Sequence, residues 1–217
     1  EFFLFFFTTI IYFFLFLQIN LKYFLISIFI TLIVISPYLH RNYILFDTLT
    51  LTKSFGYNLL KGNNPNFKVE GDAFYGEMEF PRSKLKIKTD NNYEINLDNF
   101  YKQKAIENIK KDPIKYIKFY FIKILSFLFV DLNSTYPNYY NPFHILPKIF
   151  LSITSLLGAI ISIRKKGFIQ YLSLYYFINI FIFSIFFILP RYSLILLPIQ
   201  LLLSIKIFKY LFRKLLN

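Results

Sequence analysis

Long apolar blocks, separated by short polar or basic stretches, dominate the pattern of hydrophobic and polar positions along this chain. Overall, 56% of the residues are hydrophobic. Five blocks approach the about 20 residues that a helix needs to cross a hydrocarbon core, although the first is short. They occupy residues 2–17, 23–39, 144–163, 168–189 and 193–211. Because the apolar residues lie in blocks and not at the spacing of one helix or strand face, the pattern predicts an all-α polytopic membrane protein.

A sixth apolar segment, residues 114–130, is interrupted by three lysines. At helical spacing, Lys115, Lys118 and Lys123 project within about 140° of one another, which gives one face a basic stripe. One interpretation is an amphipathic helix whose lysines reach lipid phosphates. The other is that Lys123 points into a protein-lined cavity, since a charge at membrane depth is costly unless it is paired. The segment is therefore either re-entrant, interfacial or spanning.

The segment before it, residues 40–113, has the pattern of a small extramembrane domain. The stretch "KGNNPNF" has the residue chemistry of a turn. Polar and apolar residues alternate on both sides of "DNN" in "KLKIKTDNNYEINL", Lys84–Leu97, which predicts a hairpin. A helix is expected to follow, capped by Asp98 or Asn99 and stopped by Pro113. We therefore expect an α+β insertion in an otherwise helical chain.

These elements divide the chain into three parts. We expect two transmembrane helices in residues 1–39, the extramembrane insertion in residues 40–113, and a membrane region with three further spans in residues 114–217. The first helix is expected to be truncated.

Charge is distributed unevenly along the chain, whose formal net charge is +13. Residues 41–112 are nearly balanced, with 12 Lys/Arg and 10 Asp/Glu, whereas the remainder has 13 Lys/Arg against Glu1 and Asp131. Basic residues beside spans attract anionic headgroups, so membrane lipids explain the charge and no nucleic-acid partner is expected. The absence of cysteine excludes a disulfide framework and a thiolate metal site.

The basic loops also predict a topology. Arg164–Lys166 and the basic tail favour the cytoplasm. The turn at Leu189–Tyr192 then faces the opposite side, and the helix at 144–163 begins there. The insertion is cytoplasmic if 114–130 spans and external if it does not, and Lys22 favours the external position. A multi-pass location in a bacterial inner membrane is expected.

Two prolines lie beside arginines at expected helix ends. In "SPYLHRNY", Pro37 is expected to end the second helix, so that His40, Arg41 and Asn42 turn toward the headgroups. In "PRY", Pro190 is expected to precede the last helix on the external side, with Arg191 at its start. The two arginines are expected on the same side of the membrane, bordering one cavity.

Four motifs in order give the chain a family resemblance. They are "SPYLHRNYILF", "GYNLLKGNNP", "KAIENIKKDPIKYIKFYFIKILSFLF" and "PRYSLILLPIQLLL". Over about residues 30–205 the order resembles the C-terminal half of bacterial GT-C glycosyltransferases, which are related to protein O-mannosyltransferases and lipid A aminoarabinose transferases. The resemblance implies a fragment of a larger GT-C-like helical domain. It also implies transfer of a sugar from a polyprenyl-phosphate donor to an acceptor on the periplasmic side.

The chain also departs from the family pattern. The acidic residues of the family lie in an early external loop that matches nothing here, and Asp112-Pro113 replaces the more frequent Asn-Pro or His-Pro. We therefore expect a fragment that is inactive alone, and the catalytic base is left unassigned.

The implied chemistry suggests candidate residues. A lipid phosphate that leaves a sugar gains charge, so fixed cations beside it stabilise the transition state. Arginine suits this role because its guanidinium binds phosphate oxygens bidentately. The lipid-phosphate candidates are Arg191, Lys123 and Arg41, and the substrate-binding candidates are Tyr192, Asn42 and Asn63. An interfacial anchor is the alternative role for Arg191, and a flanking charge is the alternative for Arg41.

Other functions have less support. No metal site is expected, because His40 and His144 are far apart in the sequence. Asp72, Glu77 and Glu79 are possible ligands of a divalent cation, but solvated loop charges have the same pattern, so no cofactor is expected. The main alternative is a transporter or flippase subunit for lipid-linked sugars, in which we would expect related halves or Gly/Pro-broken helices.

Overall fold

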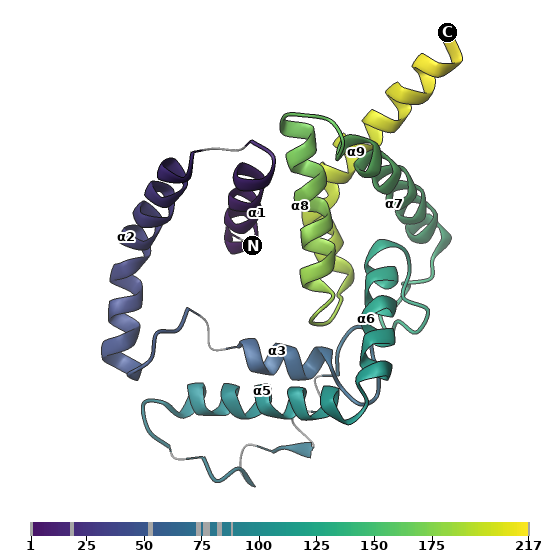
Figure 1. The fold of residues 1–217 in the computed structure, drawn as a ribbon. Helices are drawn as coiled ribbons and strands as arrows, with labels where there is room; N and C mark the ends of the chain where they lie inside the picture. Colours follow the sequence, from purple (N-terminus) through teal and green to yellow (C-terminus); the bar gives the residue numbers. More distant parts are fainter. Residues whose placement is uncertain are drawn as a thin grey trace.

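The computed structural model describes residues 2–17, 20–51, 54–72, 75, 79–81, 84–87 and 89–216, and this part of the chain is helical without strands (Figure 1). The helices are α1 (Phe2–Leu15), α2 (Leu21–Phe46), α3 (Phe55–Gly62), α5 (Tyr93–Lys111), α6 (Pro113–Leu128), α7 (Pro142–Ser162), α8 (Phe168–Phe183) and α9 (Pro190–Leu216). The all-α class is confirmed. The small α+β insertion is not.

Within the described residues, three helices are long and apolar enough to cross a membrane: α2, α7 and α9. They contain the predicted blocks at 23–39 and 193–211, and all but the last residue of the block at 144–163. The helices α1 and α8 are also apolar but shorter, with 14 and 16 residues. Helix α6 has 16 residues and is not among the three. These features are compatible with a membrane protein.

The core of the membrane region lies where α7, α8 and α9 meet. Helix α7 buries small residues at helical spacing on one face, namely Ser152, Ser155, Gly158, Ala159 and Ser162. Small residues let helix backbones approach closely, which favours packing in lipid. They meet Leu196 and Leu203 of α9, both fully buried. Hydrogen bonds join the helices as well, between Thr154 and Ser204 (2.9 Å) and between Ser155 and Tyr176 (3.2 Å).

Helices α3 and α5 lie side by side below the apolar helices (Figure 1). Leu60 of α3 packs with Leu97, Tyr101 and Ala105 of α5. The backbone N–H groups of Gly56 and Tyr57 donate to the Asp98 carboxylate, at 2.9 and 3.0 Å respectively. This carboxylate therefore satisfies the first turn of α3, where backbone donors lack intrahelical partners.

The predicted hairpin at Lys84–Leu97 is wrong, and so is the helix cap at Asp98. Helix α5 begins at Tyr93, so the second half of the expected hairpin is helical, and the described residues of its first half form no strand. The local alternation was overridden by tertiary packing, because Leu97, Tyr101 and Ala105 recur every four residues and face α3. The expected stop at Pro113 is confirmed.

The expected helix end at Pro37 is also wrong. Helix α2 continues through Pro37 to Phe46, and Asp47 follows in the left-handed conformation with φ 51°. A proline removes the hydrogen bond to the carbonyl four residues earlier, here Ile33. The Ser36 hydroxyl donates to that carbonyl at 2.8 Å and replaces the missing donor. The serine therefore explains why the helix tolerates this proline.

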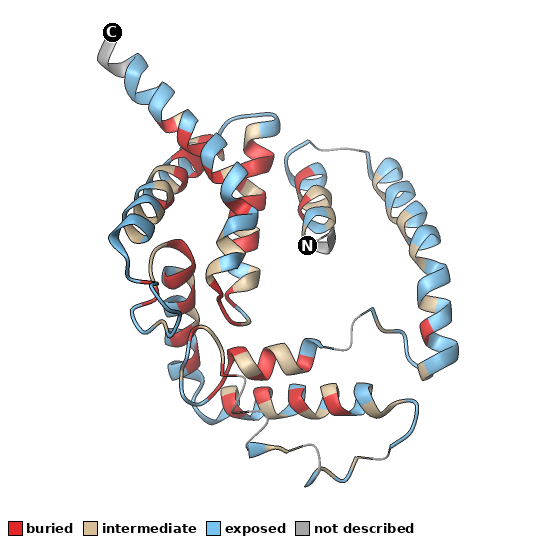
Figure 2. Cartoon of the chain, turned by 180° about the vertical axis from the view of Figure 1, so that it is seen from behind, coloured by how far each residue is buried: buried red, intermediate tan, exposed pale blue. Residues whose placement is uncertain are grey.

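The connections gather at two ends of the apolar helices (Figure 1). The end of α1, the start of α2 with Lys22, the α7–α8 connection with Arg164–Lys166, and the end of α9 with the basic tail lie at one end. At the other end lie α3, α5 and the turn between α8 and α9. Figure 2 shows α2 apart from the other helices and exposed along most of its length. These basic segments therefore share one end of the apolar helices (Figure 1).

The close contact between α7 and α9 gives a test of this packing. A Cβ added at Gly158 would collide with the backbone carbonyl of Leu203, which cannot move independently of α9. We expect Gly158→Ala to lower the free energy of unfolding by about 1–3 kcal/mol, as overpacking does. The thermal unfolding midpoint in detergent measures this change. The control is Leu157→Ala, at an exposed position on the same helix; equal midpoints for the two variants would contradict the packing.

Candidate functional site

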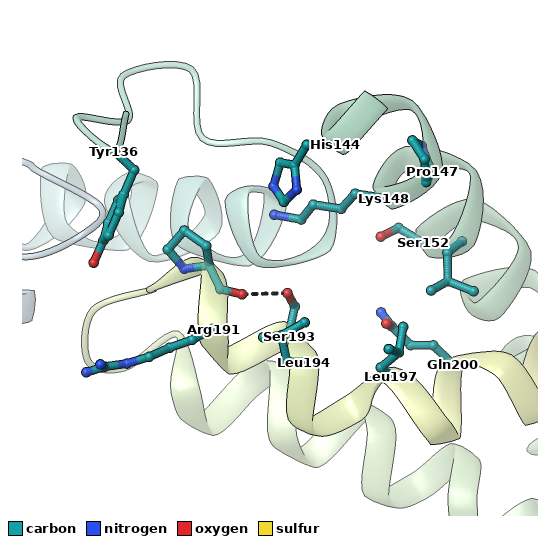
Figure 3. Close-up of a pocket in the computed structure, with 12 residues that line it drawn as sticks. Tyr136, His144, Pro147, Lys148, Ser152, Arg191, Ser193, Leu194, Leu197 and Gln200 are labelled. Atoms are coloured by element: carbon teal, nitrogen blue, oxygen red, sulfur yellow. Dashed lines mark hydrogen bonds between the residues drawn. The ribbon is translucent and has the colours of Figure 1, made fainter. Parts of the chain in front are cut away.

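A pocket of about 410 Å³ opens between the first halves of α7 and α9 (Figure 3). Its walls combine basic, hydroxyl and apolar side chains from both helices and from the loop between α6 and α7. The lining residues are Tyr136, His144, Pro147, Lys148, Leu151, Ser152, Pro190, Arg191, Ser193, Leu194, Leu197 and Gln200. Within the described residues, no carboxylate lines this pocket. The pocket therefore has a positive, amphipathic lining.

The α7 wall follows from the way the helix begins. The Asn141 side chain accepts from the Phe143 N–H at 3.0 Å, and Pro142 occupies the first turn, where no N–H is needed. His144 and Lys148 are four residues apart, so they lie on one helix face. Figure 3 shows both side chains on the pocket side of α7. Lys148 is partly buried, and its ammonium lies 3.4 Å from the Tyr139 hydroxyl.

The α9 wall begins at Pro190, so Arg191 lies in the first turn of the last helix, as the sequence predicted. Ser193 donates to the Pro190 carbonyl at 2.7 Å and steadies this turn. The Arg191 side chain is exposed and extends toward Tyr136 in Figure 3. Because the N-terminal ends of α7 and α9 both adjoin the pocket, their helix dipoles add to its positive potential.

Two consecutive residues of the segment between α3 and α5 form hydrogen bonds to both sides of the pocket mouth. Glu70 accepts hydrogen bonds from the Ser134 hydroxyl and from the N–H and hydroxyl of Thr135, the last two at 3.1 and 2.7 Å. This fixes the loop that carries Tyr136. The Val69 carbonyl accepts from the Ile188 N–H at 2.8 Å, in the turn that leads to Arg191. The segment therefore sets the spacing between the loop and α9.

The loop between α6 and α7 is also closed by its own tyrosines. The Tyr139 hydroxyl accepts from the Asp131 N–H at 3.0 Å, and the Tyr140 hydroxyl accepts from the Ser134 N–H at 2.7 Å. Burial raises the pKa of the Asp131 carboxyl, and the negative charge of Glu70 raises it further. These hydrogen bonds fix the shape of the loop, and Tyr136 therefore has a defined position at the pocket.

Lys123 lies in a different environment. Its side chain is fully buried, and its ammonium is close to four oxygens: those of Phe186 (2.7 Å), Gly62 (3.1 Å), Ile185 (3.2 Å) and the Asn63 side chain (3.3 Å). Asn63 also donates to the Ile185 carbonyl at 3.0 Å. The structure brings Lys123 and Asn63 together, but neither lines the pocket of Arg191. The hydrogen bonds of Lys123 and Asn63 therefore connect α6, α3 and the α8–α9 turn.

The predicted residues on α2 also lie away from this pocket. The buried Asn42 side chain donates to the Thr50 carbonyl at 2.7 Å, which ties the end of α2 to the following segment. Arg41 is exposed on the same helix. The structure therefore groups Arg191 with Lys148 and His144, and does not bring Arg41 to the same pocket.

The acidic stretch after Gly71 is partly described. Asp72 is buried and accepts from Asn66 and the Tyr75 N–H, at 2.9 and 3.1 Å. Burial tends to raise the pKa of Asp72, but these hydrogen bonds and the one from Lys68 outweigh it and hold the pKa below its ordinary value. Glu77 lies outside the described residues. Among the residues that are described, no group of three His, Asp or Glu could hold a metal ion.

Sequence reasoning missed Lys148, Tyr136 and Glu70. The first had a signal, because "HILPK" places His144 and Lys148 four residues apart at the start of an apolar helix. No local pattern marks the other two, since Glu70 and the 131–140 loop meet only through the tertiary fold.

Comparisons with known proteins assign no family. No family model, no curated protein and no solved structure matches the chain. The chemistry of the pocket is therefore argued from its own residues. Basic groups beside an apolar wall suit an amphipathic ligand with an anionic headgroup, since arginine and lysine both bind phosphate.

The bonds of Lys123 give a test of its structural role. Lys123→Met keeps the length of the side chain but leaves the carbonyls of Gly62, Ile185 and Phe186 without this donor. A buried polar group left unsatisfied costs about 1–3 kcal/mol. We expect a lower thermal unfolding midpoint in detergent. Lys118→Met, at an exposed position on the same helix, is the control; if both variants melted like the wild type, the ammonium would not stabilise the fold.

Proposed function

We propose that the chain belongs, as its C-terminal part, to a membrane glycosyltransferase that moves a sugar from a polyprenyl-phosphate donor to an acceptor on the periplasmic side of a bacterial inner membrane. The pocket between α7 and α9 binds the lipid phosphate. The observation that carries this proposal is the grouping of Arg191, Lys148 and His144 around one pocket with an apolar wall. The order of the sequence motifs supports the reaction class.

The pocket lining fits both halves of such a donor. The basic side chains suit a phosphate, and Leu151, Leu194 and Leu197 offer apolar surface to an isoprenoid chain. Ligand sites combine a mostly apolar lining with a few placed polar groups, and this pocket has that composition. The donor would lie along the α7–α9 seam with its phosphate at the first turn of α9.

The reaction assigns a role to the cations. The acceptor attacks the anomeric carbon and loses a proton to a base, while the bond from that carbon to the phosphate oxygen breaks. The bonding electrons remain on the lipid phosphate, which gains negative charge. Arg191 and Lys148 stabilise this developing charge. Electrostatic stabilisation of this kind accounts for the larger part of the rate enhancement in many enzymes. The base remains unassigned.

The arrangement of the helices supports the proposed side of the membrane. The pocket adjoins the starts of α7 and α9, whereas Arg164–Lys166 and the C-terminus lie at the opposite end (Figure 1). Short basic loops favour the cytoplasm, so the pocket then opens on the periplasmic side. Helix α6 enters this topology as a segment that does not cross the membrane.

Binding of polyprenyl phosphate to the chain in lipid nanodiscs tests the site. We expect Arg191→Ala to weaken binding about 10-fold, which corresponds to about 1.4 kcal/mol. Arg191→Lys should recover only part of the loss, because a point charge replaces a bidentate fork. Arg164→Ala removes an arginine at the opposite end and is the control. Equal affinities for Arg191→Ala and wild type, in folded protein, would reduce Arg191 to an interfacial anchor.

Sugar transfer in membranes that contain the complete enzyme, of which this chain is proposed to be a part, tests the reaction. With a polyprenyl-phosphate sugar as donor, we expect Arg191→Ala to lower kcat/KM roughly 10²-fold or more, the scale of a lost preorganised contact to developing charge. If the lipid-linked sugar were moved across the membrane but not transferred to an acceptor, the result would favour the alternative function, a transporter or flippase subunit.

A further inference from the structure

A second pocket, of about 250 Å³, lies between α3 and the α8–α9 turn. Aromatic rings form most of its wall, together with one carboxamide. The residues used below are Phe55 and Asn58 of α3, Phe183 of α8, Phe186 of the turn, and Tyr192 of α9. We propose that this aromatic pocket is the subsite for the sugar ring of the donor, an inference that rests on the proposed function.

The first turn of α9 contributes one residue to each of the two pockets. Arg191 lines the pocket between α7 and α9, and Tyr192 lines the aromatic pocket. Consecutive helical residues project about 100° apart and their Cα atoms are about 3.8 Å apart, so neighbouring side chains can serve two adjoining sites. In a glycosyl phosphate, one bridging oxygen joins the phosphorus to the sugar ring. One donor molecule can therefore present its phosphate to Arg191 and its sugar to Tyr192.

The lining suits a sugar more than a lipid chain. An aromatic ring has a negative face, and the C–H bonds on one face of a pyranose are weakly positive, so the two stack favourably. The edge of a sugar carries hydroxyl groups, and the Asn58 carboxamide offers both a donor and an acceptor. An isoprenoid chain has no polar atom that could form a hydrogen bond with this carboxamide. Sites for drug-sized ligands have volumes of about 300–1,000 Å³. The aromatic pocket is smaller than these sites, and its size suits a single sugar ring.

The aromatic walls are held in place before any ligand binds. The Tyr192 ring stacks on Phe183 with centroids 5.3 Å apart, and Phe55 meets Phe186 edge to face at 5.5 Å. The carbonyl of Phe186 accepts from the buried Lys123 ammonium at 2.7 Å. A wall fixed in this way loses little conformational entropy on binding. Lys123 thus acts on the sugar subsite through the backbone of the turn.

Two probes with the same lipid chain separate the subsites: polyprenyl phosphate and polyprenyl-phosphate hexose, each titrated against the chain in nanodiscs. We expect Asn58→Ala to weaken binding of the hexose probe roughly 5-fold, and to leave binding of polyprenyl phosphate unchanged, because only the hexose reaches the carboxamide. Arg191→Ala should weaken both probes. Asn91→Ala, at an exposed position before α5, is the control and should weaken neither.

A second pair of variants guards against a folding defect. Tyr192→Phe removes only the hydroxyl, whereas Tyr192→Leu removes the hydroxyl and the ring. Tyr192→Leu should therefore bind the hexose probe more weakly than Tyr192→Phe does, while the two variants bind polyprenyl phosphate equally. Equal losses for both probes, or no loss in Asn58→Ala and Tyr192→Leu, would overturn the sugar subsite while leaving the phosphate site intact. If the wild type bound neither probe, the proposed function would fall, and the subsite with it.

Discussion

The buried side chain of Lys123 joins α3 to the α8–α9 turn, and both of these segments line the aromatic pocket. Its four oxygen neighbours come from the end of α3 and from the α8–α9 turn, while the lysine itself belongs to α6. A buried polar group is costly unless it is hydrogen-bonded, so the bonds of Lys123 favour the relative positions that these segments have in the structure. The turn leads directly into Arg191 and Tyr192. The geometry of the first turn of α9 therefore depends on a bond formed by a residue remote in the sequence.

The apolar helices and the segment between α3 and α5 contribute differently to the candidate site. Helices α7 and α9 approach through small residues such as Gly158, and their seam carries the basic groups. The segment between α3 and α5 contributes Val69 and Glu70, which form hydrogen bonds to the turn and to the loop on either side of the mouth. Small residues let two helices pack closely, and these hydrogen bonds add fixed positions for the polar groups at the mouth.

The sequence was sufficient to place the apolar helices, although only three of the five predicted spans contain, within the described residues, a helix long enough to cross a membrane. It was also sufficient for the place of Arg191, because a proline favours the first turn of a helix. It was insufficient where distant contacts decided the outcome. The hydroxyl of Ser36 let α2 continue through Pro37, and packing on α3 made residues 93–97 helical. Lys123 was predicted either to reach lipid phosphate or to point into a protein-lined cavity, and the structure surrounds it with three backbone carbonyls and the Asn63 side chain. Long-range contacts of this kind produce no periodic pattern in the sequence, so the sequence does not predict them.

The central claim is that lipid phosphate binds at the first turns of α7 and α9. The most direct measurement is photo-crosslinking of the protein in membranes with a polyprenyl phosphate that carries its reactive group beside the phosphate, followed by peptide mapping. The account predicts crosslinks within residues 136–148 and 190–197, and competition by unmodified polyprenyl phosphate. Crosslinks concentrated at Arg164–Lys166, at the opposite end of the helices, would contradict it.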